Sequence, residues 1–424
     1  MLPGSILGYA RLPWKRPGSI EETPELAGIT YGCEDVEIVR NPDPDARSRG
    51  AKLAFYVTSH GFGHLNRAVA VINHVPANLP VVIRSHPNLF PHWRERLTRP
   101  AELTGHVSDA GAVNPPGDST ATDGPATLEL AARVHAEAMA RVDEEARWLR
   151  DERVAALLCD APAVPLVAAR RAGIPGLLLA NFTWADIYAP YARVAGGHAN
   201  GLVADLRRAY RQATTVFRAE PALRMAWLPG QVNVGMVANP GRDRRKELRR
   251  LLGLTSQEKL IYFYVGRYGQ NDLDWGRLEA YAAKGVHFVG YHSAPVGPLK
   301  NLHLLSPSEW HGSDLIASTD ALVAKAGYGT VCEAMAGNTP IIYPPRRGFS
   351  EFRALDRSLR SWGGGIPVSA RDFRELRLDR ALDRAFHLGP LTPPFPTDGA
   401  ARVARHLAGL CRAQSARWVS QPAG

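Results

Sequence analysis

The sequence lacks several features that would place it in a membrane or on a secretory route. Its longest apolar runs, such as Leu177–Ala180 and Leu260–Val265, are far shorter than the roughly 18 residues that a membrane-spanning helix needs. The segment Met1–Arg16 contains prolines and a glycine where a signal peptide would carry a continuous apolar stretch. We therefore expect no transmembrane helix and a cytoplasmic protein.

Cysteine and lysine are both scarce. The four cysteines (Cys33, Cys159, Cys332 and Cys411) have neither metal-ligand nor paired spacing, so we expect reduced thiols. Only 7 of the 51 basic residues are lysine, and the net charge of +10 comes from scattered arginines. Because no basic run has interleaved aromatics, we expect no nucleic-acid partner, and a peripheral contact with a membrane surface stays open.

What the chain does have is a repeated alternation of strands and helices, which is typical of parallel α/β sheets. The alternation starts at Lys52 and starts again at Leu260. The expected strands are 52–59, 80–85, 154–159, 176–181 and 214–219, then 260–265, 286–291, 321–325 and 340–343. The expected helices are 64–75, 127–151, 163–172 and 202–212, then 274–284, 310–318, 329–337, 351–361 and 399–412.

With 424 residues, the chain is long enough for two such units. We predict an α/β protein with two Rossmann-like domains that face each other across a cleft, where ligands bind at the carboxyl ends of the strands. The predicted layout is an extension 1–50, an N-terminal domain 51–228, a loop-like linker 229–241, a C-terminal domain 242–395, and a terminal helix and tail 396–424 that crosses back.

A glycine-rich turn follows the first expected strand, in the motif Phe55-Tyr-Val-Thr-Ser-His-Gly-Phe-Gly-His-Leu-Asn-Arg67. Gly63 allows close backbone approach, and the start of a helix favours a negatively charged ligand. His60 and His64 lie where the strand end meets the cleft, and an imidazole can deprotonate a hydroxyl near neutral pH. Both are candidate catalytic residues. A zinc site would need a continuous helix and a third ligand, which the glycines argue against.

A carboxylate follows a second buried strand, at Asp160 in Leu157-Leu-Cys-Asp160. We expect it at the same sheet edge as the glycine turn, where it could orient and stabilise a histidine as in catalytic triads. The alternative is that Asp160 caps the helix expected from residue 163.

The motif Lys325-Ala-Gly-Tyr-Gly-Thr-Val-Cys-Glu333 is the most specific in the chain. Backbone N–H groups of Gly327, Tyr328 and Gly329, with the Thr330 hydroxyl, can hold a diphosphate at a helix start. Glu333, one turn into the helix, could accept hydrogen bonds from ribose hydroxyls, or be a plain surface residue.

Two further residues bear on the same ligand, and an acidic pair raises the question of a metal. Glu351, after the next strand, could bind sugar hydroxyls, and Arg267 in Val265-Gly-Arg-Tyr-Gly269 could place a positive charge on the diphosphate. The pair Asp272 and Asp274 has a short acidic pattern used by metal-dependent sugar transferases. We expect no metal and no cofactor, because the helix start would take over the role of the cation.

Residues from about 52 to 363 resemble the GT-B glycosyltransferases. They are most similar to the glycosyltransferase-like half of plant L-arabinokinases, through Tyr56-Val-Thr-Ser-His-Gly-Phe-Gly-His64, the motif Lys325–Glu333 and Asn181-Phe-Thr-Trp184. The glycine turn is more distantly similar to that of the peptidoglycan N-acetylglucosaminyltransferase and of plant glucosyltransferases. In the plant glucosyltransferases, a histidine at the position of His64 is the base and an aspartate at the position of Asp160 assists it. The resemblance therefore implies these roles for His64 and Asp160.

The function that this resemblance implies is transfer of a hexosyl or pentosyl group from a nucleotide-diphosphate sugar to an acceptor hydroxyl, with inversion. By resemblance alone, the donor is first expected to carry uridine or thymidine. The acceptor, a small molecule, lipid or glycan, is left open. So are two alternatives: a protein that binds a nucleotide sugar without transferring it, and a sugar-nucleotide epimerase.

Overall fold

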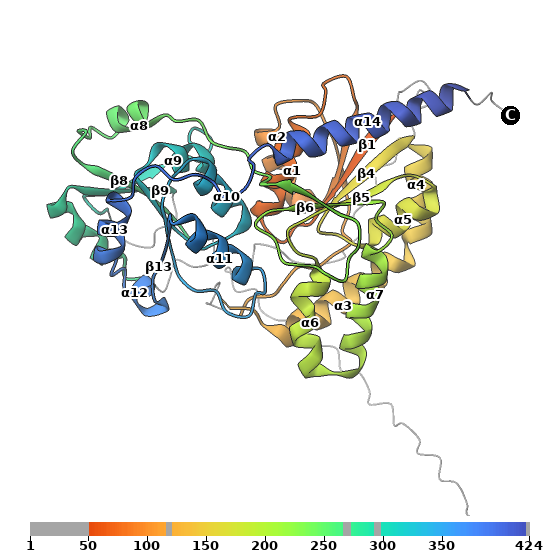
Figure 1. Cartoon of the computed structure of the whole chain (residues 1–424), viewed down its shortest axis with the longest axis horizontal. Coiled ribbons are helices and arrows are strands. Elements are labelled where there is room, and N and C mark those ends of the chain that lie inside the picture. Colours follow the sequence, from red (N-terminus) through yellow and green to blue (C-terminus); the bar gives the residue numbers. More distant parts are fainter. Residues whose placement is uncertain (1–50, 116–120, 266–272, 292–297, 421–424) are drawn as a thin grey trace, which may run out of the picture. The chain divides into compact units, whose positions relative to one another are not determined.

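Two parallel β-sheets flanked by helices make up the described part of the chain (Figure 1). The structure is a computed structural model that describes residues 51–115, 121–265, 273–291 and 298–420. The expected extension 1–50, Arg267, Asp272 and Cys33 lie outside these residues.

The first sheet has seven strands in the order β3-β2-β1-β4-β5-β6-β7, and every neighbouring pair is parallel. Its strands are β1 (Lys52–Val57), β2 (Val81–Ser85), β3 (Glu102–Gly105), β4 (Val154–Asp160), β5 (Gly176–Ala180), β6 (Thr215–Ala219) and β7 (Gln231–Gly235). Strands β1, β2, β4 and β5 are buried along their whole length. This burial is typical of a parallel sheet with helices on both faces.

The second sheet has six strands in the order β10-β9-β8-β11-β12-β13, again all parallel. Its strands are β8 (Lys259–Tyr264), β9 (Val286–Tyr291), β10 (Leu302–Leu305), β11 (Ala321–Ala324), β12 (Ile341–Tyr343) and β13 (Gly365–Pro367). This is the Rossmann order. In both sheets the strand order reverses beside the first strand, at β1/β4 and at β8/β11, which is where such sheets bind ligands.

Helices alternate with the strands as expected, and the structure contains several helices that were not among the expected ones. In the first half they are α1 (Phe62–Ile72), the 3₁₀ turn η2 (Pro87–Leu89), α2 (Phe90–Arg96), α3 (Gly124–Ala140), α4 (Val142–Asp151), α5 (Val164–Ala172), α6 (Trp184–Ala195) and α7 (Gly197–Tyr210). In the second half they are α8 (Arg245–Leu251), the 3₁₀ segment η3 (Trp275–Lys284), α9 (Gly312–Ser318), α10 (Tyr328–Ala336), α11 (Phe352–Trp362), α12 (Ala370–Arg374), α13 (Asp379–Phe386) and α14 (Gly399–Ser420).

Two expectations about elements were wrong. The single helix expected over 127–151 is two helices, α3 and α4, because the backbone leaves the helical region at Arg141. The stretch expected to be a loop-like linker, 229–241, contains β7, which is the edge strand of the first sheet. An edge strand has less apolar side-chain burial than a central one, and the glycine and asparagine in β7 gave a loop-like pattern.

The helix expected near 399–412 is α14, which runs along the first sheet in Figure 1. It contacts α1, β1, β4 and β7, and the Cys411 thiol donates to the Ala51 carbonyl oxygen over 3.4 Å. The end of the chain thus packs on its first strand. Cys159, Cys332 and Cys411 are free and buried, as expected for reduced thiols.

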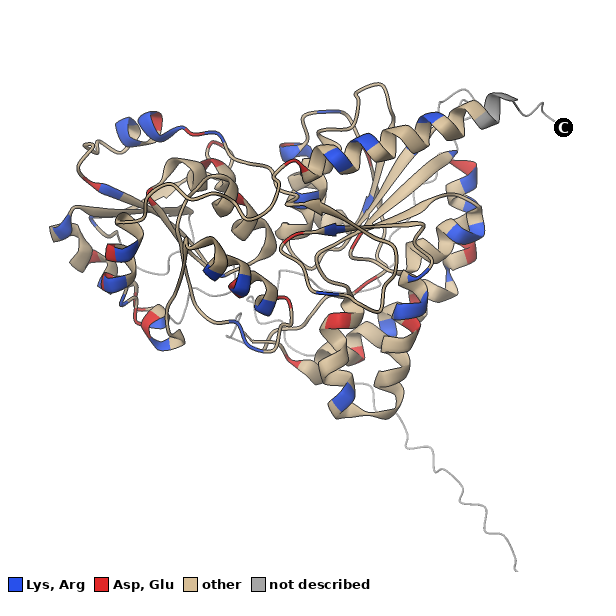
Figure 2. Ribbon diagram, viewed as in Figure 1, with Lys and Arg blue, Asp and Glu red and all other residues tan. Residues whose placement is uncertain are grey.

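Basic residues are spread widely over the helices. In Figure 2, Lys and Arg occur along α4, α5, α8, α11, α13 and α14 rather than in one group. None of the helices that the structure describes combines the length and the apolar character needed to span a bilayer.

Candidate active site

The residues singled out in the sequence come from the carboxyl ends of neighbouring strands. His64 lies in the first turn of α1, which follows β1, and Asp160 is the last residue of β4. Strands β1 and β4 are paired, with Val57 opposite Asp160. The switch point of the first sheet therefore brings the two side chains together.

His64 and Asp160 form a buried hydrogen-bonded pair. Nδ1 of His64 lies 2.8 Å from Oδ1 of Asp160. Burial opposes ionisation of Asp160, but the charge of Arg67 and hydrogen bonds from Arg67 and His64 hold the pKa of this carboxyl below its ordinary value. An ionised carboxylate only accepts hydrogen bonds, so we assign the proton of a neutral His64 to Nδ1. Nε2 then carries the free lone pair, as a base requires.

Arg67 is the main residue that the sequence reasoning missed. Its Nε donates to Oδ2 of Asp160 over 2.8 Å, and its Nη2 donates to Oδ1 of the same carboxylate. Its guanidinium also lies 4.8 Å from the ring centroid of Tyr328, in the second half of the chain. Arg67 follows His64 by three residues in α1, a spacing that places both on one helix face and could have revealed it.

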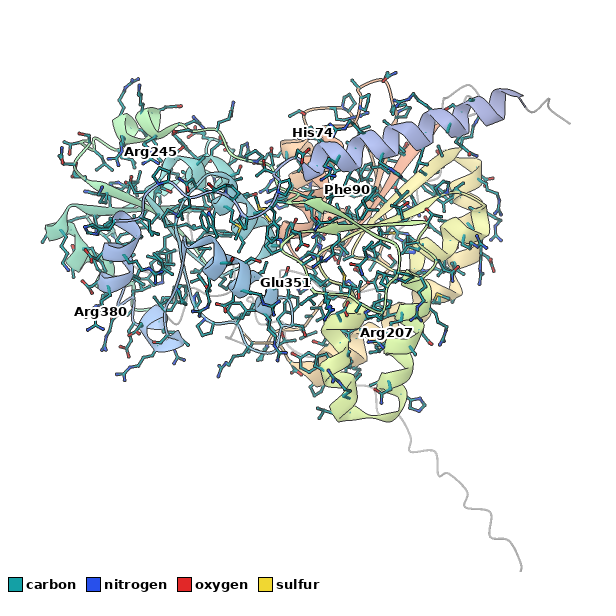
Figure 3. The ribbon with its side chains drawn as sticks, viewed as in Figure 1. His74, Phe90, Arg207, Arg245, Glu351 and Arg380 are labelled. Carbon is teal, nitrogen blue, oxygen red and sulfur yellow. The ribbon has the colours of Figure 1, made fainter. Side chains whose placement is uncertain are left out.

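Asn181 connects this cluster to the second half. The residue follows β5, as Asp160 ends β4, and Thr183 then caps α6 through a capping box with Asp186. The Asn181 Oδ1 accepts from Nη1 of Arg67 over 2.5 Å, and its Nδ2 donates to Oε1 of Glu351 over 2.6 Å. Glu351 lies at the start of α11 (Figure 3). The structure therefore brings Glu351 to the His64–Asp160 pair.

His60 lies nearby but in a separate network. Its Nδ1 accepts from the backbone N–H of Ala112 over 3.1 Å, and its ring packs against Trp184 and Phe349. Burial, then the charges of His64 and Arg346, lower the pKa of His60 to about 3. An Nδ1 that accepts a hydrogen bond leaves the proton on Nε2, so the geometry favours His60 as a neutral donor rather than as a base.

Gly111 makes room for His60. Its φ is +73°, and a Cβ at this position would lie 2.3 Å from Nδ1 of His60. Both the backbone conformation and the close approach favour glycine here.

The glycine loop after β11 meets the glycine turn after β1. A Cβ built on Gly329 would lie 3.7 Å from the Cα of Gly63. Gly327 is the N-cap of α10 and Gly61 that of α1, and neither end has a side-chain cap among the described residues. Two helix N-termini therefore start at this junction, each with the backbone N–H groups of a first turn, and Thr330 lies in the first turn of α10.

Tyr328 faces the first half. Its ring lies beside Arg67, and its hydroxyl accepts from the backbone N–H of Val237 over 3.0 Å. Tyr328 is buried, so the structure shows a packing role for its side chain between the halves.

Glu333 is not a plain surface residue. Only 8% of it is exposed, and burial raises the pKa of its carboxyl to about 8, although the nearby Arg96 lowers it. Within the described part of the chain, no hydrogen bond or ion pair to its carboxylate is present. Burial therefore keeps the Glu333 carboxyl protonated below about pH 8, and a ligand that donates hydrogen bonds to it would favour its ionised form.

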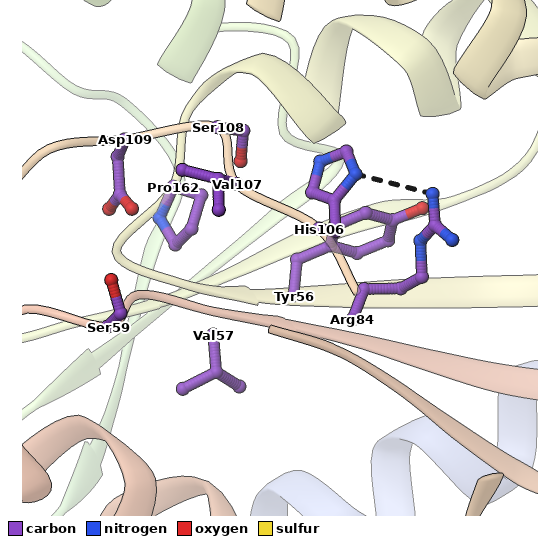
Figure 4. Close-up of a pocket in the computed structure, with 9 residues that line it drawn as sticks. All are labelled: Tyr56, Val57, Ser59, Arg84, His106, Val107, Ser108, Asp109 and Pro162. Atoms are coloured by element: carbon purple, nitrogen blue, oxygen red, sulfur yellow. Dashed lines mark hydrogen bonds between the residues drawn. The ribbon is translucent and has the colours of Figure 1, made fainter. Parts of the chain in front are cut away.

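A second carboxylate lies close to the pair. Asp109 accepts from Nε1 of Trp184 over 2.6 Å, and burial raises the pKa of Asp109 to about 6. Asp109 lines a narrow pocket with Ser59, and His106 and Arg84 lie at the other end of that pocket (Figure 4). No local sequence pattern marks Asp109, because it lies in no helix or strand.

No three His, Cys, Asp or Glu side chains of the described residues are grouped so that they could hold a metal ion. Asp274 is described, whereas Asp272 and Arg267 lie outside these residues. The predictions for those two residues are therefore left as they stand.

Comparison with known proteins gives one sequence relative and many structural ones. No protein-family model matches the chain. The chain is 27% identical over 359 residues to L-arabinokinase of Arabidopsis thaliana. The aligned region covers 84% of this chain and 34% of the relative. It thus spans about a third of that protein's length. The expected resemblance to the arabinokinases is confirmed.

Two of the solved structures that the chain resembles are glycosyltransferases. The glycosyltransferase of kitacinnamycin matches with a TM-score of 0.57 and 16% identity, over 88% of this chain and all of that one. UGT2 of Phytolacca americana, in complex with UDP-2-fluoro-glucose and pterostilbene, matches with a TM-score of 0.55 and 15% identity, over 87% and 98%. These likenesses confirm the predicted fold, which is GT-B.

Proposed function

We propose that this chain is a glycosyltransferase that moves a sugar from a nucleotide-diphosphate sugar to an acceptor hydroxyl. The observation that carries the proposal is the buried 2.8 Å pair of His64 and Asp160 at the switch point of the first sheet. A packing role alone would not require a buried ionised carboxylate held by Arg67 beside a histidine with a free Nε2.

The donor side of the proposal rests on the glycine loop and on two carboxylates. The N–H groups at the start of α10, with the Thr330 hydroxyl, would hold the diphosphate. Glu333 would accept from the ribose hydroxyls, which would favour the ionised form of its largely buried carboxyl. Glu351 would contact the sugar hydroxyls. A uridine or thymidine nucleotide stays our first choice, and a UDP sugar is present in the Phytolacca americana relative.

In the proposed reaction, Nε2 of His64 takes the proton of the acceptor hydroxyl as its oxygen attacks the anomeric carbon. The bond from that carbon to the diphosphate oxygen breaks, and the leaving diphosphate keeps the electron pair. Asp160 stabilises the imidazolium that forms, as in a catalytic triad. A single displacement of this kind inverts the anomeric carbon, so we propose inversion. The helix starts at Gly61 and Gly327 stabilise the developing negative charge, so we propose that no metal ion is needed.

The acceptor we propose is a small molecule with an apolar face. The ring of His64 packs against Phe182 and Trp184, and Phe349 packs against Phe182. All three of these aromatic residues are buried, so an acceptor whose hydroxyl reaches His64 would enter apolar surroundings, which favour an apolar partner. Pterostilbene is the small molecule in one relative, and quercetin is the ligand of Arabidopsis thaliana UGT89C1, whose TM-score is 0.55.

A second candidate function is nucleotide-sugar binding without transfer. It is favoured by the similarity to one third of a protein named as a kinase rather than as a glycosyltransferase. Such a module would need Glu333 and the glycine loop but not the His64–Asp160 pair.

A panel of nucleotide sugars tests the proposal. Thermal-shift measurements with and without EDTA identify a donor that stabilises the fold. Mass spectrometry then follows hydrolysis of that donor, or transfer to added phenolic acceptors. Transfer that persists in EDTA supports the proposal, whereas stabilisation without turnover for any acceptor in the panel favours the binding module. No stabilisation by any nucleotide contradicts both.

A further inference from the structure

A continuous hydrogen-bonded chain connects the candidate base to the second half of the molecule. Its members, in order, are His64, Asp160, Arg67, Asn181 and Glu351. All five are buried, and the first four belong to the first half, whereas Glu351 lies at the start of α11. The protonation of His64 can therefore depend on a residue of the other half.

Arg67 has two possible acceptors for one of its nitrogens. Its Nη2 donates to Oδ1 of Asp160, and the same nitrogen lies 3.2 Å from Nδ1 of His64. If Nδ1 carries the proton, His64 donates to Asp160 and keeps a free lone pair on Nε2. If Arg67 instead donates to Nδ1, the proton moves to Nε2, and that nitrogen can no longer act as a base.

The position of the guanidinium decides between these two arrangements. Asp160 accepts from its Nε and Nη2, and Asn181 holds its third nitrogen, Nη1. A side-chain amide has one oxygen that accepts and one nitrogen that donates. Because Nδ2 of Asn181 donates to Glu351 over 2.6 Å, Oδ1 must face Arg67, where it accepts over 2.5 Å. Without Glu351, the amide is free to turn and present its N–H groups to the arginine.

We propose that Asn181 is a positioning residue that, held by Glu351, keeps Arg67 on Asp160 and so keeps the proton of His64 on Nδ1. The tautomer of His64 then reports whether Glu351 is engaged. The proposal rests on the proposed function only in calling Nε2 a base, since the tautomer itself is a property of the folded chain.

The structure offers a matched pair of variants. Glu351→Gln keeps an oxygen that accepts from the Asn181 amide, whereas Glu351→Ala removes it. Asn181→Ala removes the contact with Arg67 directly. The chain has 14 histidines, so His64→Gln is needed to assign the NMR signal of His64, which is the one that disappears in this variant.

The experiment is ¹⁵N NMR of the full chain labelled in histidine, recorded at pH 8 without ligand. We expect His64 to be mainly the Nδ1–H tautomer in wild type and in Glu351→Gln, and the Nε2–H tautomer to become the major form in Glu351→Ala and Asn181→Ala. An unchanged tautomer in both of these variants overturns the proposal. So does an equal change in Glu351→Gln and Glu351→Ala.

Two controls separate this result from other failures. If Asn181→Ala does not fold, the comparison of Glu351→Gln with Glu351→Ala decides alone. Both variants replace Glu351, but only Glu351→Ala removes the oxygen that accepts from Asn181. Absence of any donor turnover in wild type would contradict the proposed function, but the tautomer comparison would still stand or fall by itself.

Discussion

The guanidinium of Arg67 lies 4.8 Å from the ring centroid of Tyr328. Arg67 follows the candidate base in α1, and Tyr328 begins the helix at the candidate donor site. A cation over an aromatic face is attractive, and more so when both groups are desolvated. The residue that holds Asp160 in place is therefore also a contact between the two halves of the chain.

Asp160→Asn should destabilise the protein strongly. Arg67 would lose its carboxylate partner and remain as a buried charge, which costs about 3–5 kcal/mol in comparable cases. Urea unfolding at pH 7 measures the loss. The double variant Asp160→Asn, Arg67→Met should recover part of the stability, because it removes the unpaired charge. A double variant less stable than the single one would contradict the account of this ion pair.

Glu333→Gln should make the free protein more stable at alkaline pH. The folded pKa of Glu333 is about 8, and an unfolded glutamate has a pKa of about 4.3. Between these values the folded chain holds a proton that the unfolded chain releases, so stability falls as the pH rises through this window.

Urea unfolding at pH 5 and at pH 8 checks this prediction. The wild type should lose more stability than Glu333→Gln between the two pH values, at most about 1.4 kcal/mol per pH unit. The exposed Glu279→Gln is the control and should track wild type. An equal loss in wild type and Glu333→Gln would remove the case for a buried, ligand-seeking carboxylate.

His60 should affect acid stability in the opposite direction. Its folded pKa is about 3, against about 6.5 for an unfolded histidine. Between these values the unfolded chain takes up a proton that the folded chain does not, so stability is lost as the pH falls below about 6.5. The variant His60→Gln should lose less stability than wild type between pH 7.5 and pH 5, by urea unfolding.

The exposed His198→Gln serves as the control for His60. If His60→Gln and His198→Gln have the same acid sensitivity as wild type, His60 is not held neutral by burial, and its assignment as a donor is wrong.

Gly111→Ala should be more harmful than Gly173→Ala, although the two glycines have nearly the same φ, +73° and +75°. Each variant bears the strain of a left-handed backbone, about 1 kcal/mol or more. Only at Gly111 would the new Cβ meet a side chain, His60 at 2.3 Å, whereas nothing lies within 4 Å at Gly173. We expect a further loss of about 1–3 kcal/mol at Gly111 in thermal or urea unfolding. His60→Ala should relieve it, and equal losses at the two glycines would show that the contact does not matter.

Local pattern predicted the parts of the site that single elements carry. His64, Asp160 and the glycine loop at Gly327 each follow a strand that the alternation of apolar and polar segments revealed. Their meeting at a switch point follows from the parallel topology. The approach of Gly329 to Gly63 is compatible with the predicted facing domains, but no local pattern paired these two glycines.

The links between elements could not be predicted in the same way. The contact of Asn181 with Glu351 joins residues 170 positions apart, and no periodicity encodes it. The sequence left open whether Glu333 is a plain helix surface residue, and packing around α10 buries it. Strand β7 was missed because edge strands need less apolar patterning than central ones.

The most direct test of the central claim is the rate of donor consumption by His64→Gln at saturating donor, measured beside wild type. The account predicts a fall of about 10²- to 10⁴-fold in transfer or hydrolysis, because general-base catalysis contributes that much. Donor affinity, measured by thermal shift, should stay close to that of wild type, since Glu333 and the α10 loop are unchanged. A variant that binds the donor and turns it over at the wild-type rate would contradict the assignment of His64 as the base.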